Sequence, residues 1–202
     1  MSQERWGILG GLFDPIHYGH LAMAEQARDE LRLGGVLFVP AGRPVHRDPP
    51  DAESQHRMRM VEMAIADNSA FEASWLEVNA DRPSYTVDTL EVLAASSPQR
   101  DFVLIVSSET ARLMSTTWRR VDRILELAEV AVVNRLGSVD LTPDWVHENY
   151  PGKEDRFVLL HTSHLGNSST DIRNRIASGK SIRYLVPQAV EAYISDHHLY
   201  GA

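Results

Sequence analysis

One stretch near the start of the chain, residues 10–20, constrains the fold more than any other: Gly-Gly-Leu-Phe-Asp-Pro-Ile-His-Tyr-Gly-His. It follows a short apolar run at residues 5–9 that predicts a buried strand. It precedes residues 21–31, where apolar side chains recur at helical spacing. Two adjacent glycines at a strand end let the backbone approach a ligand closely, and the helix that begins near Gly19 directs free amides and its positive dipole end to the same place. The order strand, glycine turn, helix therefore predicts a phosphate site.

Two histidines, His17 and His20, lie three residues apart at the start of this helix, close enough to face one bound group together. Taken singly, each feature has a simpler explanation. A Gly-Gly turn is more often a tight connection, and a histidine near a helix start more often caps or packs. Their combination after a first strand favours the functional interpretation.

The composition is that of a folded domain. With 202 residues the chain is long enough for one well-buried core and short for two, so we expect a single domain spanning residues 1–202. Apolar residues make up 43% and charged residues 24%, and no apolar run is long enough to span a bilayer. The absence of cysteine excludes disulfides, thiolate nucleophiles and cysteine metal sites. No secretory signal is visible, so we expect a cytoplasmic protein that does not contact membranes.

The chain is acidic, with 20 basic and 28 acidic residues and a formal net charge of −8. This balance argues against a broad surface for a nucleic-acid polymer. An acidic protein that binds polyphosphate must gather its basic side chains or Mg²⁺ in one cleft, because its overall field repels the ligand.

Strand and helix patterns alternate along the chain. Short apolar or alternating runs predict further strands at residues 36–39, 71–78, 102–106, 130–133 and 157–161. Helical patterns occupy residues 51–67, where Met60, Met63 and Ala64 mark the core side, a stretch ending near residue 95, residues 124–127, and residues 188–198. Residues 138–155 predict a loop with room for one turn of helix. The alternation predicts an α/β, Rossmann-like fold, an open and mostly parallel sheet with helices on both faces.

In such sheets ligands bind outside the carboxyl ends of the strands, at the point where strand order reverses. We expect this switch point between the first strand and the strand that ends at Val106.

A second stretch with polar chemistry is residues 167–175, Asn-Ser-Ser-Thr-Asp-Ile-Arg-Asn-Arg. Serine or threonine before a helical run, with Asp171 in the first turn, is an ordinary N-terminal cap. The same hydroxyl-rich start also offers amides and side chains to phosphate oxygens, and Arg173, one turn in, adds a bidentate charge.

These two stretches resemble the two signatures of the nucleotidyltransferase superfamily, His-x-Gly-His after a glycine-rich strand end and Ser-Ser-Thr-x-x-Arg. The longer form with Phe-Asp-Pro before the histidines is similar to that of the bacterial nicotinate-nucleotide adenylyltransferases. Class I aminoacyl-tRNA synthetases share the histidine motif but pair it with a Lys-Met-Ser-Lys-Ser loop, which this sequence lacks. The two signatures lie roughly 150 residues apart, and the resemblance extends over residues 6–198.

The resemblance implies roles for individual residues. Catalytic roles fall to His17, His20 and Arg173. ATP and phosphate binding fall to Gly10, Gly11, Leu12, Phe13, Gly19, His46, Arg47, Ser168, Ser169 and Thr170. Contacts to the pyridine nucleotide fall to Ser84, Tyr85, Thr86, Trp118 and Arg135. By composition alone, residues 40–47 would be a solvated loop, Ser84 or Thr86 an N-cap, and Arg135 a surface arginine.

One segment departs from the family pattern. Relatives carry Gly-x-Asp at the end of the strand that corresponds to residues 102–106, with the aspartate near the adenosine ribose. This chain has Ser107-Ser108-Glu109, which makes Glu109 the candidate ribose contact, and the spacing to Trp118 is one residue longer.

The activity implied is adenylyl transfer from ATP to nicotinate mononucleotide, with Mg²⁺ carried by ATP and no metal site on the protein. Alternatives within the class are adenylyl or cytidylyl transfer to nicotinamide mononucleotide, phosphopantetheine or glycerol phosphate, and residues 84–86 and Trp118 argue against the last two. Outside the class, residues 107–109 leave open a nucleotide-binding regulator with weak catalysis. Homo-oligomer formation is also left open.

Overall fold

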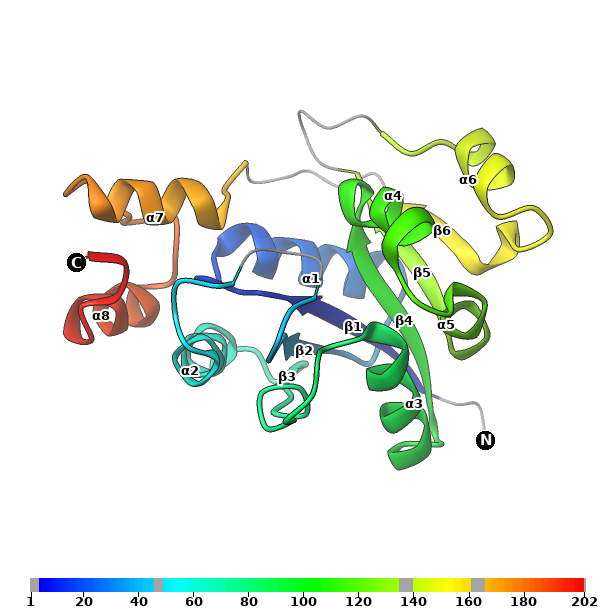
Figure 1. Ribbon diagram of the computed structural model, residues 1–202, viewed down its shortest axis with the longest axis horizontal. Coiled ribbons are helices and arrows are strands. Elements are labelled where there is room, and N and C mark those ends of the chain that lie inside the picture. Colours follow the sequence, from blue (N-terminus) through cyan, green and yellow to red (C-terminus); the bar gives the residue numbers. More distant parts are fainter. Residues whose placement is uncertain (1–3, 46–48, 135–139, 161–165, 202) are drawn as a thin grey trace.

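The computed structural model describes residues 4–45, 49–134, 140–160 and 166–201. Its core is one six-stranded sheet in the order β3-β2-β1-β4-β5-β6, in which all neighbouring strands are parallel. The strands are β1 (Glu4–Gly11), β2 (Gly35–Pro40), β3 (Phe71–Ala73), β4 (Arg100–Ser107), β5 (Ala128–Val133) and β6 (Phe157–Leu160). The expected Rossmann-like α/β fold is confirmed, with a sheet that is wholly parallel and open (Figure 1).

Helices cover both faces of the sheet. One hydrophobic cluster joins the sheet to α1 (Tyr18–Glu30), α2 (Ser54–Ile65), α7 (Ser169–Ala177) and α8 (Gln188–Asp196). A second cluster, on the other face, joins it to α3 (Thr86–Ser96), α4 (Ser108–Thr117) and α5 (Val121–Leu127). The remaining elements are α6 (Pro143–Asn149) and the 3₁₀ helices η1 (Glu154–Arg156) and η2 (Leu199–Gly201).

The central strand β4 shows why the sequence builds two layers. Side chains of a strand point alternately to its two faces. Phe102, Leu104 and Val106 enter the cluster with α3, α4 and α5, while Val103 and Ile105 enter the cluster with α1 and α2. A run that is apolar at every position therefore belongs to a strand buried on both faces.

The expected strand at residues 71–78 is wrong beyond Ala73. After the amide of Ser74 donates to the Phe38 carbonyl at 2.9 Å, the chain turns, and the Asn79 amide donates back to the Trp75 carbonyl at 2.9 Å. Trp75 contacts α2 rather than a neighbouring strand, and its indole nitrogen donates to Glu62 at 2.8 Å.

Two smaller expectations also change. Residues 138–155, expected to be a loop with room for one turn of helix, contain the longer helix α6 at residues 143–149. Thr142 caps this helix and Pro143 occupies its first turn. Met60 and Ala64 are buried as expected, but Met63 is 40% exposed and lies outside the core. The strand expected at residues 157–161 is confirmed over Phe157–Leu160, and His161 lies outside the described residues.

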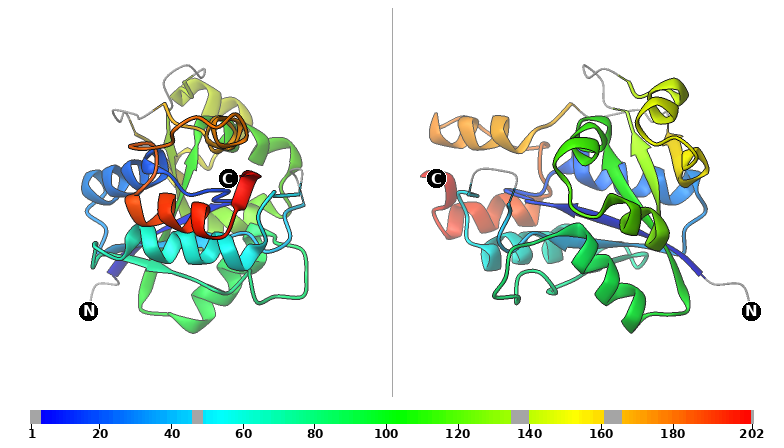
Figure 2. Two further views of the ribbon diagram at one scale, coloured as in Figure 1. Left: turned by 90° about the vertical axis from the view of Figure 1, so that its left-hand side faces the viewer. Right: turned by 45° about the vertical axis from the view of Figure 1, so that its right-hand side comes forward.

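Because all strands are parallel, their carboxyl ends lie at one edge of the sheet. The first strand β1 sits in the middle, with β2 on one side and β4 on the other, so the strand order reverses between β1 and β4 as expected. The turn η2 lies at the same end of the molecule as α7 and α8, and far from the start of β1 (Figure 1). In a view of that end, α2, α7 and α8 lie in front (Figure 2). In the described part of the chain, no helix combines the length and apolar character that crossing a membrane requires.

Candidate functional site

The two histidines form one stacked pair at the start of α1. His17 is the N-cap residue and is 5% exposed, and its ring stacks on that of His20 with centroids 3.7 Å apart and planes 18° apart. The His17 backbone amide donates to Nδ1 of His20 at 3.3 Å. Since Nδ1 then acts as an acceptor, the neutral ring carries its proton on Nε2, the nitrogen suited to donate to a ligand.

The ring of Phe13 packs against this pair at His20. The Phe13 ring is buried and packs edge to face against that of His20, with centroids 5.0 Å apart. The backbone of Phe13 has φ = 50°, a conformation that non-glycine residues rarely adopt. The loop between β1 and α1 is thus held in a specific and costly conformation.

The glycine pair ends β1 beside this loop. Gly10 is exposed, and a Cβ atom placed on it would approach only the Val39 carbonyl oxygen, at 4.0 Å. A Cβ atom on Gly11 would touch the Phe13 ring at 3.3 Å. Packing inside the protein therefore does not require glycine at position 10, which leaves close approach of a ligand as the physical reason for it.

The second signature packs directly against the first. Ser168 caps α7 by accepting from the Asp171 amide at 3.1 Å, as the cap pattern predicted. Ser169 Oγ donates to the Pro15 carbonyl at 2.9 Å, and Arg173 Nη1 donates to the Asp14 carbonyl at 2.9 Å. The structure therefore brings the two signatures together, with Thr170 exposed in the first turn of α7.

Arg173 also meets a carboxylate. Its Nε lies 2.5 Å from Oδ2 of Asp51, whose side chain is 61% exposed. Both groups lie beside the loop that carries the histidines, so this arginine is at the loop but already neutralised by a neighbour. A polyphosphate bound here would compete with Asp51 for the guanidinium.

A buried arginine that sequence analysis missed supports the loop. Arg57 is 0% exposed, and its guanidinium donates to the carbonyls of Leu12 at 2.6 Å, Ala41 at 2.7 Å and Ala52 at 3.1 Å. Burial lowers the pKa of Arg57, and the nearby Asp14 carboxylate partly offsets this. Its spacing of three and four residues from the buried Met60 and Val61 was the available signal that it faces inward.

Asp14 is the acidic partner in this support. Its buried carboxylate accepts from the amides of Asp51 at 2.8 Å and Ala52 at 3.1 Å. The hydroxyl of Tyr200, near the chain end, donates to it at 2.8 Å.

Residues 84–86 precede and begin α3. Tyr85 is the N-cap residue and its side chain makes no capping bond, so the alternative of Ser84 or Thr86 as the cap is wrong. Ser84 Oγ instead accepts from the amides of Gly42 at 3.1 Å and Arg43 at 3.3 Å, in the loop after β2. Ser84 is thus held to the loop at the carboxyl edge of the sheet.

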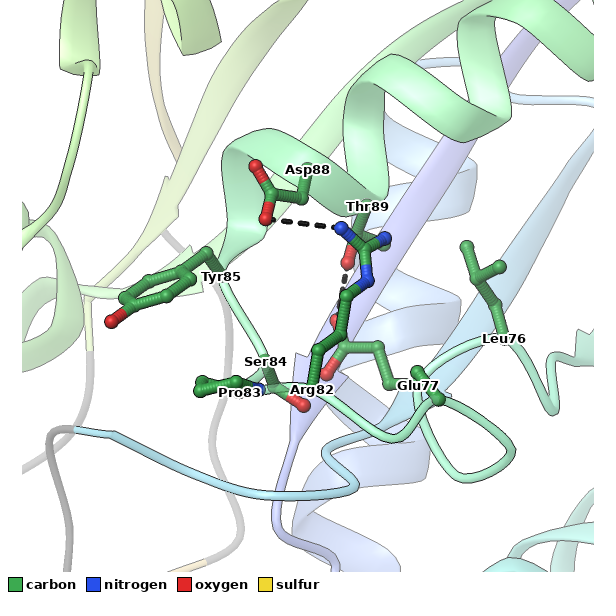
Figure 3. A pocket seen from close by; sticks show the side chains of 9 residues that line it. Leu76, Glu77, Arg82, Pro83, Ser84, Tyr85, Asp88 and Thr89 are labelled. Atoms are coloured by element: carbon green, nitrogen blue, oxygen red, sulfur yellow. Dashed lines mark hydrogen bonds and ion pairs between the residues drawn. The ribbon is translucent and has the colours of Figure 1, made fainter.

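Glu77 lies beneath this segment. Its carboxylate accepts from the Thr89 hydroxyl at 2.6 Å, and burial raises its pKa above the ordinary value of 4.5. Figure 3 shows Glu77 and Thr89 facing each other, with the Tyr85 ring turned away. The cavity among these side chains measures about 10 Å³, room for one water molecule and too small for a pyridine nucleotide.

Tyr85 and Trp118 are brought to the same face of the sheet. Both are half-buried against the cluster that contains α3 and α4. The guanidinium carbon of Arg119, next to Trp118, lies 4.1 Å from the centroid of the Tyr85 ring. The segments expected to hold the pyridine are therefore in contact.

The departure at residues 107–109 has a local explanation. Ser107 caps α4 by accepting from the Thr110 amide at 3.2 Å, Ser108 is buried, and Glu109 is exposed in the first turn. Serine at position 107 therefore stabilises the helix start. His46, Arg47 and Arg135 lie outside the described residues. Among the residues that are described, no group of three or more acidic or histidine side chains could hold a metal ion.

Comparison with known proteins identifies the family of this chain. A family model described as "Cytidylyltransferase-like" matches residues 8–175. The chain is 44% identical to the "Probable nicotinate-nucleotide adenylyltransferase" of a Roseiflexus species over 99% of this chain and 100% of the relative. It is 38% identical to the protein of the same name from Thermomicrobium roseum, over 98% and 92% of the two chains.

Among solved structures, the nicotinic acid mononucleotide adenylyltransferase of Plasmodium falciparum complexed with NaAD is similar in fold. Its TM-score is 0.79 at 18% identity, covering 98% of this chain and 97% of that one. The chain therefore belongs to the cytidylyltransferase-like family and, within it, to the nicotinate-nucleotide adenylyltransferases.

Proposed function

We propose that this enzyme transfers the adenylyl group of ATP to nicotinate mononucleotide, releasing pyrophosphate and forming nicotinate adenine dinucleotide on a route to NAD. The observation that carries the proposal is the contact between the two signatures, in which Ser169 and Arg173 bond to the carbonyls of Pro15 and Asp14. The names of the relatives support the same substrates.

The nucleophile belongs to the substrate. A phosphate monoester is already ionised near neutral pH, so its oxygen can attack the α-phosphorus of ATP without an enzyme base or a covalent intermediate. The new P–O bond forms as the bond to pyrophosphate breaks, and negative charge builds on the α-phosphoryl oxygens and the leaving group. Catalysis then consists of alignment and charge stabilisation.

The residues at the stacked pair suit this task. His20, with its proton on Nε2, donates to the α-phosphoryl oxygens as charge builds. His17 and Arg173 hold the β and γ phosphates, and Arg173 exchanges Asp51 for phosphate when ATP binds. Gly10, Gly11 and Gly19 allow close approach, and the start of α7 contributes amides and the hydroxyls of Ser168, Ser169 and Thr170. We also assign phosphate contacts to His46 and Arg47, and to the backbone at Leu12 and Phe13.

Magnesium enters as part of the substrate MgATP. The described residues near the loop offer imidazoles, guanidinium groups and hydroxyls, and the carboxylates of Asp14 and Asp51 are bonded within the protein. Phosphate oxygens of ATP and water would then supply its ligands, and the ion would neutralise charge at the leaving pyrophosphate.

The pyridine end binds on the α3 and α4 face. Trp118 stacks on the ring, while Tyr85 and Thr86 at the start of α3 recognise its substituent and Ser84 holds the loop in place. Arg135 contacts the nucleotide and Glu109 the ribose. We assign residues 1–202 to one such domain, cytoplasmic and acting on small molecules rather than on nucleic-acid polymers.

The test is a substrate panel. Purified enzyme is given MgATP with nicotinate mononucleotide, nicotinamide mononucleotide, phosphopantetheine or glycerol phosphate in separate reactions, and pyrophosphate and product mass are measured. We expect pyrophosphate and dinucleotide in equal amounts from nicotinate mononucleotide. Product from nicotinamide mononucleotide alone would overturn the substrate assignment, and tight ATP binding without pyrophosphate release would indicate a regulator.

A further inference from the structure

We propose that Arg57 and Tyr200 are positioning residues for the loop that carries His17 and His20, so that the last turn of the chain takes part in adenylyl transfer. The inference rests on the proposed function, because it concerns the alignment of the histidines assigned to phosphate. Neither residue belongs to either signature.

The loop is held through its own backbone. Between β1 and α1, the carbonyl of Leu12 accepts from Arg57 at 2.6 Å, that of Asp14 from Arg173 at 2.9 Å, and that of Pro15 from Ser169 at 2.9 Å. These donors come from α2 and α7, which are far from the loop in sequence. Each carbonyl is therefore fixed by tertiary structure.

Such support is needed because of the conformation of Phe13. Its φ of 50° is unfavourable for a residue with a side chain and persists only where the surroundings enforce it. Phe13 in turn contacts the ring of His20. A relaxation of the loop at Leu12 or Asp14 would therefore move an imidazole assigned to the reacting phosphate.

Arg57 ties this loop to two others. Its donation to Leu12, Ala41 and Ala52 joins the loop after β1, the loop after β2 and the start of α2. Because the guanidinium is completely buried, it contacts no substrate and acts only through these carbonyls.

Tyr200 acts from the opposite side through the Asp14 carboxylate. Its hydroxyl donates to Oδ1 at 2.8 Å across 186 residues of sequence, while the amides of Asp51 and Ala52 donate to the same carboxylate. Burial and the nearby Asp14 raise the pKa of Tyr200, so the phenol stays protonated and remains a donor.

The chain end adopts an unusual conformation to make this contact. His198 and Tyr200 have φ values of 50° and 61°, both in the left-handed region, and Gly201 follows with 84°. The turn η2 packs against α7 and α8, at the end of the molecule where the chain finishes (Figure 2). The strain is consistent with a turn whose task is to direct one hydroxyl at Asp14.

The experiment compares two single-oxygen deletions. Tyr200→Phe removes the donor to Asp14. Tyr193→Phe is the matched control, because Tyr193 lies on the neighbouring helix α8 and its hydroxyl lies 3.0 Å from Nδ1 of His56, away from the loop. For both variants, kcat and KM for MgATP and nicotinate mononucleotide, thermal unfolding, and the histidine imidazole resonances in NMR spectra are measured.

We expect Tyr200→Phe to lower kcat about tenfold with KM for both substrates within about twofold, since misplacement of about 1 Å can cost as much as a hundredfold in rate. It should shift the resonances of His17 and His20. Tyr193→Phe should keep kcat and shift those of His56 and His197 instead, even where both variants lose the same thermal stability.

A kcat of Tyr200→Phe within about twofold of the wild type would overturn the inference. So would an equal fall in both variants, which would indicate general destabilisation. If Tyr200→Phe failed to fold, Arg57→Lys decides by the same measurements, because one ammonium group cannot reach three carbonyls and kcat should again fall at unchanged KM. A wild-type enzyme that forms no dinucleotide would instead refute the proposed function itself.

Discussion

The backbone amide of His17 donates to Nδ1 of His20 at 3.3 Å, while the two rings stack with centroids 3.7 Å apart. This pair fixes the tautomer of His20 and the direction in which it donates. The end of β1, the glycine turn and the start of α1 together hold the two rings in this arrangement.

Replacing Gly10 with alanine should affect substrate binding rather than folding. A Cβ atom there would come no closer than 4.0 Å to the protein, but it would occupy the space that a phosphate needs. We expect KM for MgATP to rise about tenfold at unchanged melting temperature, because the added methyl group would push the phosphate away from the backbone. Gly7→Ala is the contrast: its Cβ atom would lie 2.8 Å from Cδ1 of Ile105, so the melting temperature should fall while KM stays the same. The opposite pattern would contradict a ligand at Gly10.

Trp118→Ala should weaken the pyridine substrate selectively. Aromatic stacking on a base contributes about 1–3 kcal/mol, so KM for nicotinate mononucleotide should rise by about tenfold or more while KM for MgATP is unchanged. Trp145→Ala is the control, because Trp145 packs against the same cluster from α6. An equal rise in KM for nicotinate mononucleotide in both variants would contradict the assignment of Trp118 to the pyridine.

Arg57→Met should unfold the protein at markedly lower urea concentration. It leaves three buried carbonyls without their donor, a loss of about 3–5 kcal/mol in the free energy of unfolding. Arg59→Met, two residues along α2, removes an arginine whose side chain is 57% exposed and pairs with Glu62, and should cost about 1 kcal/mol or less. Similar losses would mean that the buried network does not stabilise the fold.

The raised pKa of Glu77 predicts a dependence of stability on pH. Its folded pKa lies above 4.5, so the folded state holds a proton that the unfolded state releases. The wild type should therefore lose stability relative to Glu77→Gln as pH rises from 4.5 through the folded pKa, by at most about 1.4 kcal/mol per pH unit.

Urea titrations at several pH values measure this difference. Glu91→Gln should show the reverse direction, because hydrogen bonds from Arg120 and Arg123 lower the pKa of Glu91, and the wild type then gains stability as pH rises. A flat difference between wild type and Glu77→Gln would contradict the raised pKa.

Local patterns in the sequence were sufficient for much of the fold. The apolar run of β4 and the cap at Ser168 depend on neighbours within a few residues, so periodicity and helix-start chemistry predicted them. The strand predicted at residues 71–78 was too long because the bulky residues after Ala73 have the pattern of a strand. Trp75 instead bonds to Glu62 on α2, a contact that the local sequence does not reveal.

The candidate site was predictable in its signatures but not in their support. Nothing local reveals that Tyr200 reaches Asp14, or that Ser84 accepts from the loop after β2, since both contacts arise only when distant segments pack together. The burial of Arg57 conflicts with the usual exposure of arginine, and only its three carbonyl partners make it tolerable.

The turnover of His20→Ala at saturating MgATP and nicotinate mononucleotide tests most directly whether the stacked pair stabilises the transferred phosphoryl group. Loss of one donor aimed at developing charge lowers kcat by about 10² to 10³. We expect a fall of this size while nucleotide binding persists. Turnover close to that of the wild type would contradict the assignment of His20 to the reacting phosphate.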